Sequence, residues 1–177
     1  MLKTRHDLVV DASVAIQASD TALNERSRAC HAFLETMRHV GHRVVMSREI
    51  QDEWQARPNK YSTKWLAEMI KKNRYVFIRT IGFISLEATI NEVISEETIR
   101  NLVQEDRHLL AAALASDRRV ASSDKRVRDH LKTYIKYLGD VGSICWVNPT
   151  IEQENAKEWL SNGAPEEAHR RLDFVES

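Results

Sequence analysis

The chain has 177 residues, with 26 basic and 26 acidic side chains and therefore no net charge at neutral pH. This length suits one domain with a proper core, and no apolar run approaches the ~20 residues that span a bilayer. We expect a cytoplasmic protein, because no signal peptide precedes the first apolar run and the two cysteines, Cys30 and Cys145, form no ligand pattern. Neutrality does not exclude a polyanionic substrate, since acidic residues gathered at one place would leave the other surfaces basic.

The first third of the chain alternates apolar runs with segments of helical periodicity. Asp11 follows the first run, Gly41 is a helix stop, and Ser47 is placed to cap the next helix. We predict a strand at 8–10, helices at 13–16 and 22–40, a strand at 43–46 and a helix at 48–57. The helix at 22–40 carries an apolar face that starts with Leu23. Strands that alternate with helices indicate a parallel sheet with crossover helices, and hence an α/β fold.

The rest of the chain continues this alternation less regularly. Pro58-Asn59 breaks the chain, the stretch 79–95 has no clear assignment, and Ser95 followed by two glutamates favours a helix start. We predict a helix at 62–73, a strand at 75–78, helix from 95 to about 116 with or without a break, a strand at 119–122, a helix at 125–138 and a strand at 144–147. In the tail, Thr150 and Gln153 have capping-box spacing, Asn162-Gly163 ends a helix, and Pro165 starts another.

Two carboxylates come directly after predicted strands. Asp11 follows the strand at 8–10, and Asp124 follows the strand at 119–122. Because the carboxyl ends of parallel strands meet at one edge, where open α/β sheets bind ligands, both side chains are expected at the same edge. Each has a simpler explanation as the N-cap of the following helix.

Asp106 lies in the middle of an apolar helix face. The face comprises Leu102, Asp106, Leu109, Leu110 and Ala113, which share one side at helical spacing. A lone buried carboxylate is costly and needs a partner, either a cation or a neighbouring side chain that donates to it.

Glu53 is the acidic residue of the helix at 48–57 that is best placed to reach the interior. It borders the apolar line through Ile50 and Trp54, whereas Asp52 points away. The simpler explanation of Glu53 is a solvated residue on the helix surface. We expect Trp54 to lie in the core.

A convergence of Asp11, Glu53, Asp106 and Asp124 would raise some of their pKa values by mutual repulsion, which a hard divalent cation such as Mg²⁺ or Mn²⁺ relieves. The seven histidines show no zinc-ligand spacing, and the chain has no glycine-rich phosphate loop and no nucleophile-elbow motif.

The ordered blocks that carry these acids resemble the PIN-domain nuclease family, which includes the VapC-type toxins of prokaryotic toxin–antitoxin pairs. The matching blocks are 9–13, 47–54, 106–115 and 120–124. The resemblance implies a five-stranded parallel sheet between helices, that is, a three-layer α/β/α fold. It also implies that Asp11, Glu53, Asp106 and Asp124 are the catalytic acids that hold Mg²⁺ or Mn²⁺. Ser122 matches a hydroxyl position of the family's site, and Ser13 lies close to Asp11.

This resemblance implies a metal-dependent endoribonuclease, with single-stranded or loop RNA as its substrate and an antitoxin and a second copy of the chain as partners. The nuclease domain would span 1–147, with an insertion-like helical segment at 56–101 and a helical extension at 148–177 packed on the same domain. Two alternatives stay open: a housekeeping or defence nuclease without an antitoxin, and a catalytically silent scaffold that binds RNA or protein.

Clusters of basic residues offer contacts to phosphate groups of such a substrate. Lys125, Arg126 and Arg128 follow Asp124 directly, Arg118-Arg119 precede it, and 71–74 forms a second patch. Each cluster is also compatible with an ordinary solvated face.

Overall fold

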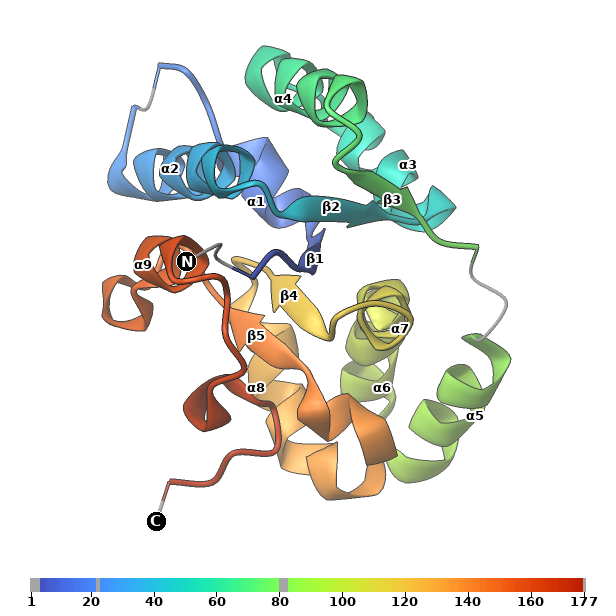
Figure 1. Cartoon of the computed structure of the whole chain (residues 1–177). Coiled ribbons are helices and arrows are strands. Elements are labelled where there is room, and N and C mark those ends of the chain that lie inside the picture. The colour runs from blue at the N-terminus through green and yellow to red at the C-terminus, as the bar shows by residue number, and fades with distance from the viewer. Residues whose placement is uncertain (1–3, 22, 80–82, 177) are drawn as a thin grey trace.

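The computed structural model describes residues 4–21, 23–79 and 83–176, and its centre is one parallel sheet (Figure 1). The sheet has five strands in the order β3-β2-β1-β4-β5. The strands are β1 (Asp7–Val10), β2 (Arg43–Met46), β3 (Tyr75–Phe77), β4 (Arg119–Ala121) and β5 (Cys145–Val147). Val9 of the central strand lies opposite Val45 on one side and Val120 on the other, and all three are fully buried. Runs of β-branched residues suit this position, where both faces of the sheet are covered.

Helices cover both faces of the sheet, which gives the predicted three-layer α/β/α arrangement. The helices are α1 (Ala12–Gln17), α2 (Glu25–Val40), α3 (Arg48–Ala56), α4 (Lys60–Lys71), α5 (Phe83–Val93), α6 (Glu97–Glu105), α7 (Arg107–Leu114), α8 (Lys125–Tyr134) and α9 (Ala156–Ser161). Helices α2 and α9 pack together on one side, and α7 lies on the other side with α5 and α6 (Figure 1). Short 3₁₀ turns are η1 (Ile135–Tyr137), η2 (Gly139–Ser143), η3 (Glu152–Glu154) and η4 (Ala168–Arg170).

The predicted strands are all present, and most predicted helices are confirmed with shifted ends. Helix α2 begins at Glu25 because Asn24 caps it, so Leu23 lies outside the helix and is 85% exposed. The prediction that Leu23 starts the buried face was therefore wrong. Helix α4 begins at Lys60, because the Asn59 side chain accepts a hydrogen bond from the Ser62 amide at 2.7 Å. The residue that was expected to break the chain is thus the cap of the helix.

The stretch without an assignment supplies α5, and the helix predicted from 95 to 116 is broken. The break falls at Asp106, whose φ of −101° and ψ of 7° end α6 and start α7. Ser95 does not cap this helix, because Glu96 holds the N-cap position and makes no side-chain cap bond. The segment 56–101 contains strand β3 between α4 and α5, so it contributes an edge strand to the sheet as well as helices.

The tail beyond residue 147 lies along the outer edge of β5 and under α2. Helix α9 packs on α2, and residue Arg171 forms an antiparallel bridge with Cys145. Gly163 ends α9 at a φ of 92°, as predicted. The predicted capping box was wrong, because the Thr150 hydroxyl donates to the Asn148 side chain, and the Pro165 helix start was wrong, because the next turn begins at Ala168.

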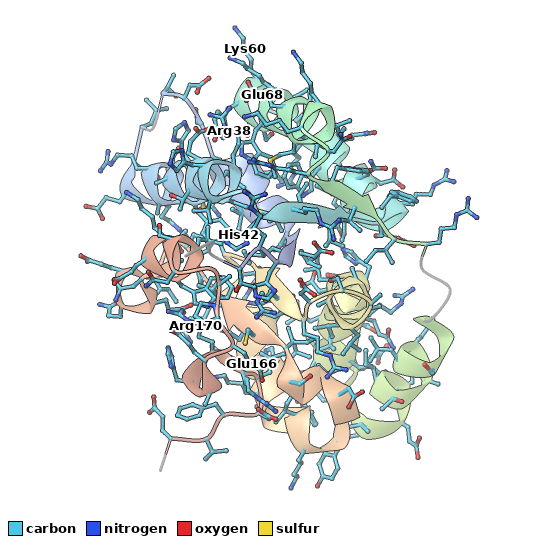
Figure 2. All side chains as sticks on the ribbon, in the orientation of Figure 1. Arg38, His42, Lys60, Glu68, Glu166 and Arg170 are labelled. Atoms are coloured by element: carbon cyan, nitrogen blue, oxygen red, sulfur yellow. The ribbon has the colours of Figure 1, made fainter. Side chains whose placement is uncertain are left out.

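Polar side chains join the helices of one layer to each other. Arg38 on α2 forms an ion pair with Glu68 on α4, and the two side chains meet between the helices (Figure 2). Trp65 of α4 donates its indole N–H to the Leu34 carbonyl of α2 at 2.9 Å. None of the helices in the described parts of the chain has the length and apolar character that a membrane crossing requires.

Candidate functional site

Asp11 is fixed at the carboxyl edge of the sheet by two hydroxyl groups. Its backbone N–H donates to the Ala121 carbonyl at 2.9 Å, which extends the β1–β4 ladder to the carboxylate itself. One carboxylate oxygen accepts from the Ser13 hydroxyl at 2.5 Å and from the Ser122 hydroxyl at 2.6 Å. Both supporting serines named by the sequence therefore contact Asp11, and the carboxylate is 7% exposed.

Asp124 lies at the neighbouring strand end and is held by a cation. Its backbone N–H donates to the Ser122 hydroxyl at 3.1 Å, so Asp11 and Asp124 share one serine. Its carboxylate caps α8 at the Arg126 amide and pairs with the Arg126 guanidinium at 3.0 Å. Burial alone would raise the pKa of Asp124, but the hydrogen bonds and charge of Arg126 outweigh it and lower that pKa.

Glu53 extends from α3 to a histidine that the sequence analysis did not single out. Its carboxylate lies 3.0 Å from Nε2 of His108, which is buried on α7. Burial lowers the pKa of His108, but the hydrogen bond to Glu53 and the charges of Glu53, Asp106 and Asp11 together raise it above its usual value. The sequence signal for His108 is its position beside two leucines and two residues after Asp106. This signal indicates a place near the acids only once the helix break at Asp106 is known.

Asp106 is the carboxylate on which the others act. It is partly buried at the break between α6 and α7, and no hydrogen bond or ion pair reaches its carboxylate from the described residues. Burial raises its pKa first, and the negative charges of Asp11, Glu53 and Asp124 raise it further, against His108, to about 7. The structure thus brings the predicted acids within electrostatic reach of one another, since each of the other three perturbs Asp106.

The oxygen donors suit a hard divalent cation, although they are not arranged around one. Within the ranges that the structure describes, no three His, Cys, Asp or Glu side chains are placed to hold a metal ion. Two of the acids are engaged elsewhere, Asp124 with Arg126 and Glu53 with His108. The unpartnered carboxylate of Asp106 is the feature that fits a cation, because an ion would supply the positive charge it lacks.

The basic residues expected at the mouth of the site are paired or lie elsewhere. Lys125 pairs with Asp129, Arg126 with Asp124 and Arg128 with Glu154, so none of the three is placed for substrate alone.

Two further basic clusters lie at the amino edge, opposite the acids: Arg118-Arg119 is at the start of β4, and 71–74 directly precedes β3. Their expected place near the acids was wrong, because even a strand of three residues separates its two ends across the sheet.

The comparisons with known proteins assign no family to the chain, so its function is argued from these side chains. No family model matches the chain, and no curated protein or solved structure matches it. Fold and site together define a three-layer α/β/α protein with an acidic group of side chains at the carboxyl edge of its sheet.

Proposed function

We propose that this protein is a metal-dependent endoribonuclease of the PIN type, in which Asp11, Glu53, Asp106 and Asp124 hold Mg²⁺ or Mn²⁺. The observation that carries the proposal is Asp106, a partly buried carboxylate without a donor in the described chain and with a pKa of about 7. A residue in this state destabilises the metal-free fold at neutral pH, and such states are concentrated at functional sites. The position of the acids at the carboxyl edge of a parallel sheet supports the same proposal.

Each side chain has a definable part in phosphodiester hydrolysis. A bound divalent ion supplies an acidified water and charge relief on the phosphate. Asp11, held by Ser13 and Ser122, is the fixed ligand, and Asp106 is the ligand whose charge responds most to the ion. Water attacks the phosphorus, the bond to the 3′ oxygen breaks, and that oxygen takes a proton, which leaves a 5′-phosphate and a 3′-hydroxyl.

Two ion pairs must open before all four acids can face one ion. Asp124 has to leave Arg126, and Glu53 has to turn from His108. Both carboxylates are partly exposed and their partners lie on the same edge, so these are side-chain rotations that leave the strands in place. The released Arg126 guanidinium then becomes a phosphate contact beside the reacting group.

The test is cleavage of a defined single-stranded RNA with Mn²⁺, with the product ends identified. We expect Asp11→Asn and Asp106→Asn each to lower the rate at least ~100-fold, and Glu53→Gln to lower it while its neighbour Asp52→Asn does not. Asp52 lies on the same helix and is 69% exposed, which makes it a matched control. Cleavage by the wild type in the presence of EDTA would refute the proposal. So would cleavage by Asp106→Asn at the wild-type rate.

The physiological part of the proposal is a toxin that an antitoxin neutralises. Expression of the wild-type chain should stop growth, expression of Asp106→Asn should not, and co-expression of the neighbouring gene product should restore growth. Normal growth with abundant active enzyme would instead support a housekeeping or defence nuclease.

A silent scaffold that binds RNA or protein is the second candidate, because in this structure the His108 ring already contacts Glu53 and Arg126 already pairs with Asp124. It predicts that Mn²⁺ neither raises the melting temperature nor produces cleavage.

A further inference from the structure

A basic pocket lies at the amino edge of the sheet, across from the acidic site. Arg5 precedes β1 by two residues, Arg43 is the first residue of β2, and Arg74 directly precedes β3. These three strands are neighbours and parallel, so their amino ends meet at one place. The side chains, together with Lys72, line a pocket of about 460 Å³.

Gly41 forms the floor of this pocket and keeps it open. It ends α2 at a φ of 97°, in the left-handed region that favours glycine. A Cβ at this position would lie 3.1 Å from Nε of Arg5 and 3.4 Å from Cζ of Arg74. Two guanidinium groups therefore stand over the same point, and like charges this close repel each other unless an anion lies between them.

The acidic residues of the pocket are already engaged by other groups. Arg43 holds Asp7 with two hydrogen bonds, at 2.6 and 2.8 Å. Asp117 accepts the Asp7 amide at 2.8 Å and lies 3.1 Å from the His6 ring. Each carboxylate therefore already has donors of its own, and Asp117 keeps its charge, because these contacts outweigh burial and lower its pKa.

The remaining cations are Arg5, Lys72 and Arg74. Arg74 donates to the Arg38 carbonyl, which orients its guanidinium without adding negative charge. None of these three cations has an ion pair within the part of the chain that the structure describes. The pocket thus offers three positive groups and room for more than one phosphate.

We propose that this pocket binds a diphosphate or triphosphate group of a small ligand. The two guanidinium groups match phosphate oxygens in planar pairs, and the Lys72 ammonium adds a movable point charge. The four cations that line the pocket outnumber its two carboxylates, which leaves a net positive charge to attract a pyrophosphate. The pocket lies at the edge opposite the acids, so this site does not depend on the nuclease proposal.

Calorimetric titration of the full chain with inorganic pyrophosphate, in EDTA, tests the site directly. We expect saturable binding that Arg5→Gln and Lys72→Gln each weaken at least ~10-fold, as the loss of a charge-assisted contact should. The control is Arg48→Gln, since Arg48 is 87% exposed on a different element. Arg5 is exposed and its side chain forms no ion pair within the described residues, so its replacement should leave the melting temperature unchanged.

Parallel titrations identify the source of the phosphate group. Tighter binding of ADP than of pyrophosphate would show that a nucleoside adds contacts, and equal binding would assign the site to the phosphates alone; either supports the proposal. Absence of saturation at millimolar pyrophosphate, or equal losses in Arg5→Gln and Arg48→Gln, would overturn it. So would binding through Arg5 of an RNA without terminal phosphates when pyrophosphate does not bind, because the surface would then serve a nucleic-acid backbone.

Discussion

Asp106 is a carboxyl group whose surroundings favour its neutral form. Burial and three nearby carboxylates raise its pKa from 3.8 to about 7, and only His108 opposes this. Ionisation at neutral pH therefore costs the metal-free fold free energy that a bound cation would return. The same residue lies at the break between α6 and α7, so it is at a bend and not on a continuous helix face.

Replacement of Asp106 by asparagine should stabilise the metal-free protein in a pH-dependent way. Because the folded pKa lies above the unfolded one, the contribution of Asp106 to stability is complete below pH ~4 and is lost as pH rises through about 7. The shift corresponds to at most ~4 kcal/mol. In urea unfolding with EDTA, the free energy of unfolding of Asp106→Asn should exceed that of the wild type at pH 8. The difference should be much smaller at pH 5.

A divalent cation should stabilise the wild type more than it stabilises Asp106→Asn. At pH 8, Mn²⁺ should raise the melting temperature of the wild type and have little effect on Asp106→Asn, since the variant lacks the charge that the ion neutralises. Equal gains in both proteins would show that the ion binds away from Asp106.

At this scale the sequence located the acids better than it located their partners. Asp11 and Asp124 were predictable because each follows an apolar run at a strand end. The pairing of Asp124 with Arg126 and of Glu53 with His108 was not, because both depend on side-chain directions that spacing does not reveal. His108 was overlooked because a continuous helix would have placed it away from Asp106.

The helices are joined to one another through their caps as well as through their apolar faces. Asn59 caps α4 by accepting from the Ser62 amide, and its amide group donates to the Ala15 carbonyl at 2.7 Å and the Ile16 carbonyl at 3.2 Å. One side chain therefore starts α4 and holds the end of α1. The Asn24 side chain caps α2 by accepting from the Ser27 amide at 2.8 Å, and within the described residues it forms no hydrogen bond to a second element.

The two asparagines should differ in their contribution to stability. Asn24→Ala should cost ~1 kcal/mol for the lost cap, and Asn59→Ala should cost ~2–3 kcal/mol because buried carbonyls of α1 lose their donor as well. Chemical denaturation of both variants at one pH provides the comparison. Equal losses would mean that the contacts to α1 contribute nothing.

Elements with strong local patterns were predictable, and elements fixed by tertiary contacts were not. The strands and α2 follow from runs of apolar residues at regular spacing. Helix α5 lies in the stretch 79–95, for which we made no assignment, and the start of α4 was obscured because Pro58-Asn59 is compatible with a break as well as with a cap. The predicted capping box in the tail was wrong for a similar reason, because the Thr150 hydroxyl that was expected to cap a helix donates to the Asn148 side chain.

At the scale of the whole molecule, one buried histidine connects three distant parts of the chain. His42, labelled in Figure 2, is fully buried beside β2. Its Nδ1 accepts the His6 amide at 3.0 Å, and its Nε2 lies 3.1 Å from the Leu160 carbonyl of α9. The neutral ring with its proton on Nε2 satisfies both contacts, and burial lowers the pKa of His42.

Acid should therefore weaken the protein through His42. Its folded pKa lies below the unfolded value of 6.5, so its contribution is present above pH ~6.5 and is lost as pH falls. His42→Ala should cost ~2–4 kcal/mol at pH 7.5, because it leaves a cavity and two unpaired backbone groups. The difference between the two proteins in urea unfolding should shrink at pH 5, and a constant difference would exclude protonation of His42 as the cause.

The layered fold was the most predictable property of the molecule, and the distribution of its charges was the least. Strand–helix alternation led to the parallel sheet, which the structure shows. A residue such as Arg119 was expected near the acids because it is close to Asp124 in sequence, but β4 carries it to the opposite edge, where its guanidinium donates to the Ala164 carbonyl at 2.6 Å. Which edge a charge reaches depends on whether it precedes or follows a strand.

The two outer strands of the sheet differ in how they are covered. Beside β5, Leu172 donates to the Ile144 carbonyl and Arg171 forms its bridge with Cys145, whereas β3 pairs only with β2 in the described chain. Further strands can join from one direction alone. If two molecules paired through their β3 edges, each would have used the edge that is open to a further strand. Self-association by this route would therefore end at a dimer and would not extend into fibrils.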